Sequence, residues 1–324
     1  MVRRLLIFLV AAHCAAASGT TPDSAASRPN PRTAAGKYQT WRTAAAAALI
    51  ARADANSLAT AAALRFASPT NGPSALDLAA RASELAPQSA SIGWMRLQLC
   101  LRTPACDVRD AATVMRWVDA DNGAAWLQAL GVAQKDPTEV DRILADMAHG
   151  TRFDFYWNRI VVLMADALHA VRNQVPGSYP SSDASRLKLV SGIASAELIP
   201  PFSALVEACR ESGSAQERRE LCLKLSKIMQ RGDTVVAQMV GFSIERRLHA
   251  PDSKEARAIA ERRRVLEWRV AAAAKFDDAL LPWTKNARAR ARLMQMRAMP
   301  REEDVCIAIL REHKMALDPP EIHP

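Results

Sequence analysis

The apolar residues of this 324-residue chain recur at spacings of three and four along most of its length. Trp41, Ala45 and Leu49 follow this spacing near the start of the chain. The spacing matches the 3.6 residues per turn of an α-helix, because it places apolar side chains on one stripe. Sustained apolar–polar alternation, which is typical of strands, does not occur, and alanine, the best helix former, is abundant. The pattern predicts an all-α protein.

Prolines, glycines and short polar residues divide this pattern into helical segments. We expect helices over residues 38–52, 55–67, 74–86, 90–101, 107–118, 124–134, 137–148, 153–173, 183–197, 201–212, 215–231, 233–248, 252–280, 284–298 and 301–316. Asp183, Asp233 and Ser253 are expected N-caps, since short oxygen-bearing side chains accept the first N–H groups of a helix. Short helices must bury their apolar faces against neighbours. We therefore expect stacked antiparallel helical hairpins, arranged as an α-solenoid or as an irregular helical array.

A repeat signal runs through residues 74–148. The positions that carry it are Ala75, Ala79, Ala82, Pro87, Trp126, Leu130 and Gly131. Their spacing resembles degenerate tetratricopeptide repeats, whose period is about 34 residues. The chain departs from that family at Ala120, which replaces the terminal proline of the second unit. The resemblance implies tetratricopeptide-like geometry and a scaffold that binds a protein or peptide.

The N-terminus is typical of a cleaved secretory signal. Arg3 and Arg4 precede an apolar run at 5–12, and three alanines at 15–17 offer a small-residue cleavage site. We therefore expect a signal peptide over 1–17 and an exported, periplasmic or secreted protein. A buried N-terminal helix and a lipoprotein anchored at Cys14 are the alternatives.

Composition divides the rest of the chain into four parts. Residues 18–36 are small, polar and proline-containing, and we expect a flexible linker there. Two prolines and a glycine within 174–182 separate an N-terminal tetratricopeptide-like region, 37–173, from a C-terminal helical region, 183–317. A non-helical tail, 318–324, follows. No segment after the signal is long and apolar enough to predict a transmembrane helix.

Basic residues outnumber acidic ones, with 43 Lys and Arg against 34 Asp and Glu. Signal cleavage would remove two of the basic residues and none of the acidic ones, which leaves a net charge of +7. An exported protein meets little nucleic acid, so we expect no nucleic-acid partner. An anionic envelope surface or an acidic protein partner fits the charge better. An arginine-rich solvated helix surface is the explanation that we favour over both.

Five cysteines follow the expected signal peptide. Cys100 and Cys106 flank one predicted helix corner, and Cys209 and Cys222 flank another. In an oxidising compartment such neighbours form disulfides, so we expect both pairs to be bridged. Cys306 is left over, and we expect it to be buried, because it lies between Val and Ile at a helix start.

Motifs that carry catalysis, cofactors or metals are not found in the sequence. No CxxC, HExxH, GxSxG, Walker A or GxGxxG motif occurs, so we expect no catalytic, cofactor-binding or metal-ligating residues. His169 lies late in an apolar helix and is expected to be a partly buried core residue.

One short stretch, Leu-Met-Gln-Met at 293–296 with Met-Pro at 299–300, resembles a motif of lytic transglycosylases. Arg292 stands where that family has glycine. The upstream region offers Asp277 and Asp278 in place of the catalytic glutamate. Glycosidic cleavage needs a general acid, so these departures leave the motif without its chemistry.

We therefore expect an exported helical-repeat scaffold that binds a protein or peptide in the cell envelope. An envelope enzyme, such as a peptidoglycan hydrolase or lyase, is the first alternative. A structural or immunity-type partner protein is the second.

Overall fold

The structure is a computed structural model that describes residues 31–66, 72–104, 106–175, 180, 182–210, 216–278 and 282–320. Over these ranges the chain is all helical, with no strand and a single isolated bridge between Asn122 and Arg152. The predicted all-α class is confirmed. The part of the chain described here contains no helix long and apolar enough to cross a membrane.

The helices follow the predicted order closely. Their bounds are α1 Pro31–Arg52, α2 Ala55–Phe66, α3 Ala75–Leu85, α4 Ala90–Leu101, α5 Val108–Val118, the 3-10 helix η2 Gly123–Trp126, α6 Leu127–Ala133, α7 Pro137–His149, α8 Trp157–Ala170, α9 Asp183–Glu197, α10 Ser203–Arg210, α11 Gln216–Met229, α12 Val235–Arg247, α13 Lys254–Asp278, α14 Pro282–Ala298 and α15 Glu302–Glu312. Two starts differ from the expected ones by more than two residues, when η2 and α6 are taken together. Helix α1 begins at Pro31, inside the segment expected as a linker, and α8 begins four residues later than expected. Residues 1–17, which are expected to be a signal peptide, lie outside the described residues.

Local caps explain where several helices begin. Ser253 accepts the N–H of Ala256 at 3.0 Å, as predicted. The other two expected caps are wrong by one residue, because Ser182 caps α9 and Thr234 caps α12. The carboxylate of Asp233 therefore does not cap α12, and it binds other groups in the core.

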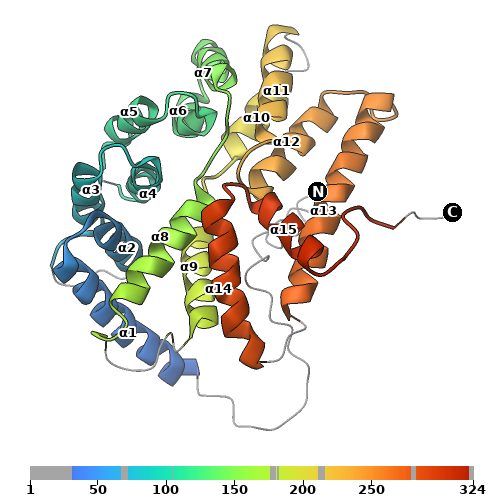
Figure 1. Ribbon diagram of the computed structural model, residues 1–324. Coiled ribbons are helices and arrows are strands. Elements are labelled where there is room, and N and C mark those ends of the chain that lie inside the picture. The colour runs from blue at the N-terminus through green and yellow to red at the C-terminus, as the bar shows by residue number, and fades with distance from the viewer. Residues whose placement is uncertain are drawn as a thin grey trace.

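The helices pack as a closed circuit (Figure 1). Each of α1 to α5 packs on the next, and the circuit continues through η2 and α7 to α11, α12, α13 and α15. It closes where α14 packs on α15 on one side and on α8 and α9 on the other, while α8 also packs on α2. In Figure 1 the green helices α8 and α9 lie between the blue helices at the start and red α14. The regions 37–173 and 183–317 therefore share one packed body.

Aromatic side chains fill the centre of the circuit. Trp94 of α4 stacks on Phe155 with ring centroids 5.1 Å apart, and Phe155 also contacts Phe153 and Phe202. The Trp94 indole N–H donates to the carbonyl of Leu198 at 3.1 Å. Phe153 and Phe155 belong to an extended segment that enters α8 through the core, and both are buried. This segment links the first helices of the chain to the α9–α10 connection.

The backbone of that buried segment needs partners, and Asp233 supplies them. Its carboxylate accepts the N–H of Phe155 at 2.8 Å and the N–H of Trp157 at 3.0 Å. The Asp233 carbonyl accepts the N–H of Glu302 at 2.7 Å, and the Glu302 carboxylate accepts the N–H of Val235 at 2.9 Å. Three separate parts of the chain thus meet at one buried residue, Asp233. We call Asp233, Glu302 and the N–H groups that they bind the acidic hub.

The geometry beside the hub leaves little freedom for substitution. A Cβ at Gly232 would lie 2.5 Å from the carbonyl oxygen of Phe153, so only glycine fits there. Tyr156, between the two N–H donors, has a φ of 58° and so adopts the left-handed conformation that is uncommon outside glycine. Its hydroxyl donates to Asp119 and accepts from Asn122 at 2.9 Å, which secures this strained turn.

Burial sets the protonation of the hub. Removal from water, and then the neighbouring Asp154 carboxylate, raises the pKa of Asp233 to about 8 despite its two N–H donors. Burial also raises the pKa of Glu302 to about 7. Both groups bind a proton more tightly in the folded chain than in the unfolded chain, where a carboxyl pKa is about 4. Their stabilising contribution is therefore present at low pH and is lost as pH rises through the folded pKa values.

We predict that the free energy of unfolding falls by on the order of a few kcal/mol between about pH 5.5 and about pH 9. Denaturant unfolding at a series of pH values measures this slope. Asp233→Asn should flatten the slope, because the amide does not titrate, while the exposed control Asp252→Asn should leave it unchanged. A parent protein whose stability rises or stays constant across this range would contradict the prediction.

Candidate functional site

The structure places both predicted cysteine pairs at disulfide distance. Cys100 and Cys106 join the end of α4 to the start of α5, with their Cα atoms 5.3 Å apart. Cys209 and Cys222 join α10 to α11, with their Cα atoms 5.7 Å apart. Both separations lie within the range of natural disulfides. Cys306 is fully buried in α15, as expected from its apolar neighbours.

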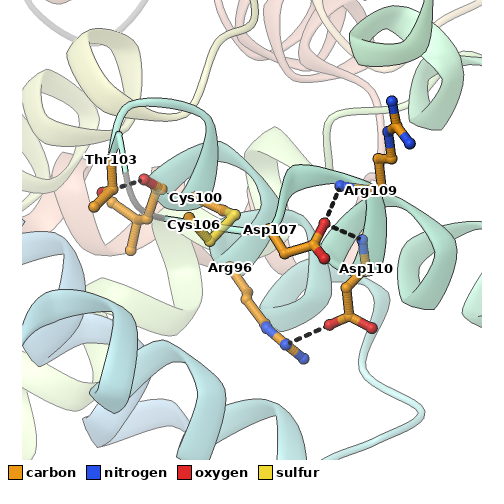
Figure 2. The surroundings of a disulfide bond; sticks show 8 residues. Arg96, Cys100, Thr103, Cys106, Asp107, Arg109 and Asp110 are labelled. Carbon is orange, nitrogen blue, oxygen red and sulfur yellow. Dashed lines mark hydrogen bonds and ion pairs between the residues drawn. A yellow bond between two sulfur atoms is a disulfide. The ribbon is translucent and has the colours of Figure 1, made fainter.

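The corner closed by Cys100 and Cys106 is also held by hydrogen bonds (Figure 2). The Thr103 hydroxyl donates to the carbonyl of Leu99 at 2.9 Å, which ends α4. On the other side Asp107 accepts the N–H of Asp110 at 3.1 Å and caps α5. The disulfide therefore reinforces a turn that is flanked by hydrogen bonds on both sides.

Asp233 and Glu302 have strongly raised pKa values and are candidates for a general acid, but both are inaccessible. Asp233 is 3% exposed and Glu302 is 9% exposed, and the partners of both are backbone N–H groups. A general acid must reach the proton acceptor of its substrate. Their arrangement therefore supports architecture rather than catalysis. The side chains of Asp277 and Asp278 lie outside the described residues.

Two further results concern ligating side chains. Within the described ranges, no group of three His, Cys, Asp or Glu residues is arranged to hold a metal ion. The expectation for His169 is wrong, because its side chain is exposed in the last turn of α8. Leu168 points into the core, and the next residue along a helix is rotated by about 100°, which carries His169 to the surface.

The most distinctive surface chemistry lies where α5, η2 and α7 meet. Trp126 is the last residue of η2 and is half-buried. The guanidinium carbon of Arg116 lies 4.4 Å from the Trp126 ring centroid, and that of Arg142 lies 5.8 Å from it. Trp117, next to Arg116, is 72% exposed, which is unusual for so large an apolar side chain. We call Arg116, Trp117, Trp126 and Arg142 the arginine–tryptophan surface.

Ion pairs within α7 hold one side chain of this surface, Arg142. Arg142 pairs with Glu139 at 2.6 Å and with Asp146 at 2.7 Å, both on α7. The pKa of Arg116 is lowered, first by partial burial and then by the nearby charge of Arg142. Two guanidinium groups are therefore held close to one indole ring. The Asp146 carboxylate, which is paired with Arg142, opposes this lowering of the Arg116 pKa and so relieves part of the repulsion between the two guanidinium groups.

The sequence identified part of this surface. The repeat spacing singled out Trp126. Trp117 was missed, although it lies off the predicted apolar stripe of α5, which includes Ala112 and Met115. That position was the available signal, since an apolar side chain on the polar face of a helix faces solvent.

The disulfides give a prediction about stability. Loop-closure entropy implies that Cys209→Ala with Cys222→Ala costs about 3 kcal/mol, and that Cys100→Ala with Cys106→Ala costs about 2 kcal/mol, because its loop is shorter. Denaturant unfolding of the two double variants measures both losses. A third variant, in which all four of these cysteines are replaced by alanine, serves as a reference. The parent protein treated with reductant should be about as stable as this variant. Free thiols at these positions in protein purified from an oxidising compartment would contradict both pairings.

Comparison with known proteins leaves the family open. No protein-family model, curated protein or solved structure matches this chain. The likeness to tetratricopeptide repeats therefore rests on the sequence positions alone, and function has to be argued from the surfaces of the structure.

Proposed function

We propose that the protein is an exported helical scaffold that binds an acidic segment of a partner protein or peptide in the cell envelope. The observation that carries the proposal is the arginine–tryptophan surface. Two disulfide pairs fit an oxidising compartment, which supports export. The repeat resemblance over 74–148 adds support, because that part of the chain includes the surface.

The chemistry of this surface suits protein recognition. Tryptophan and arginine are enriched among the residues that contribute most to protein interfaces. The Trp126 ring and its two guanidinium neighbours are fixed before binding, so a partner would lose less conformational entropy on docking. Arg116 favours an acidic partner, whereas Arg142 is already paired with Glu139 and Asp146. The exposed Trp117 ring offers the partner apolar contact area.

The enzyme alternative has less support from the described residues. Its clearest candidates for a general acid, Asp233 and Glu302, are buried in the acidic hub. A binding role uses side chains that are already exposed and that have no evident structural purpose, above all Trp117.

We predict that the parent protein retains one stoichiometric partner from envelope extracts. Trp117→Ala and Arg116→Ala should each weaken that binding at least tenfold, because both remove side chains typical of interface hot spots. Quantitative pull-down followed by calorimetry with the isolated partner measures the loss. Binding should also weaken as salt is raised, since ionic screening reduces the attraction between exposed charges.

Val132→Ala is the matched control for Trp117→Ala. Val132 lies on neighbouring α6 and is 74% exposed, so the substitution Val132→Ala also removes an exposed apolar side chain. The control should bind the partner as tightly as the parent does. If the partner is recovered equally with Trp117→Ala and Arg116→Ala, the arginine–tryptophan surface is not the binding site.

A further inference from the structure

A separate cavity of about 620 Å³ lies between α1, α2 and α9. Apolar side chains from α2 and α9 line much of it, including Leu64, Leu189 and Ile193. Tyr38 and Arg42 contribute its wall on α1. The volume falls within the range of small-molecule sites in proteins, which is about 300–1,000 Å³. None of these helices contributes to the arginine–tryptophan surface.

Arg42 is the unusual residue of this cavity. Arg42 is only 7% exposed. No carboxylate among the described residues forms an ion pair with it. Its Nε donates to the carbonyl of Leu64, and its guanidinium carbon lies 5.9 Å from the centroid of the Tyr38 ring. Its Nη2 is buried and has no hydrogen-bond partner within the described part of the chain. A buried charge without a counter-ion destabilises a fold, so an arginine in this position calls for an anion.

The other charges around the cavity do not supply that anion. Glu197 lines the cavity, but its carboxylate pairs with Arg102 at 2.6 Å. Lys188 adds a second cation to the lining. The cavity therefore combines an uncompensated guanidinium with apolar walls.

Gly192 keeps one side of the cavity open. It lies within α9, where glycine costs about 1 kcal/mol relative to alanine. A Cβ added at Gly192 would meet no atom within 4 Å, so close packing does not require glycine there. Because Gly192 lines the cavity, a larger side chain at this position would occupy space that is now available to a ligand.

We infer that this cavity binds a small anionic amphiphile, a molecule with a carboxylate head and an unbranched apolar chain. The planar guanidinium of Arg42 suits a carboxylate, which it can bind through two parallel hydrogen bonds. Leu64, Leu189 and Ile193 contact the apolar chain. This site is distinct from the surface proposed to bind a protein partner.

Calorimetric titration of the full chain with decanoate tests the inference. Decanoate should bind at least tenfold more tightly than decyltrimethylammonium, which has a similar chain and the opposite charge, and than acetate, which lacks the chain. Gly192→Leu should weaken decanoate binding at least tenfold by filling the cavity. Its matched control, Gly131→Leu, makes the same change in α6 at another helical position where a Cβ meets no atom within 4 Å, and it should bind like the parent.

Arg42→Leu provides an independent arm. It should weaken decanoate binding at least tenfold, and the ligand-free variant should unfold at the same temperature as the parent or higher, because a buried uncompensated charge has been removed. Arg231→Leu removes an exposed arginine elsewhere and should leave binding unchanged. Equal binding of the cationic amphiphile, undetectable binding of decanoate, or parent-like binding by Gly192→Leu would each overturn the inference. If Arg42→Leu fails to fold, Gly192→Leu and its control decide the matter.

Discussion

The carboxylate of Asp233 is the constraint on which the rest of the structure depends. An extended segment crosses the core to enter α8, and buried backbone N–H groups need partners wherever no helix supplies them. Asp233 binds two of these groups, on either side of Tyr156, while its own carbonyl holds the start of α15. The segment that enters α8, the start of α12 and the start of α15 are joined at this point. The closed circuit of helices follows from that junction together with the aromatic cluster around Phe155.

This architecture separates stability from recognition. Asp233 and Glu302, whose carboxyl pKa values are strongly raised, are buried and bind backbone N–H groups of the core. The groups left for ligands are cations and aromatic rings, in two different places. On α5, η2 and α7, arginines surround Trp126 at the surface. Between α1 and α9, Arg42 faces apolar walls. We propose an acidic macromolecule as the partner of the first place, which is exposed, and a small anionic amphiphile as the ligand of the second, which is enclosed by three helices.

Local patterns in the sequence predicted most helices and both cysteine pairs. Helix periodicity, proline breaks and the short spacing between Cys100 and Cys106 all act over a few residues, so they can be read without knowing the fold. Features that depend on residues far apart in the chain were missed. Asp233 was expected to cap α12, but its partners lie more than seventy residues away. The cavity at Arg42 was also missed, because only folding brings α1 beside α9.

Amide hydrogen exchange at Phe155 and Trp157 tests the central claim most directly. If Asp233 joins the three parts of the chain, these two amides exchange only through global unfolding and rank among the slowest in the protein. Replacing Asp233 with alanine should then accelerate exchange together in the segment that enters α8 and in the first turns of α12 and α15. Rapid exchange at Phe155 and Trp157 in an otherwise protected parent protein would contradict the account.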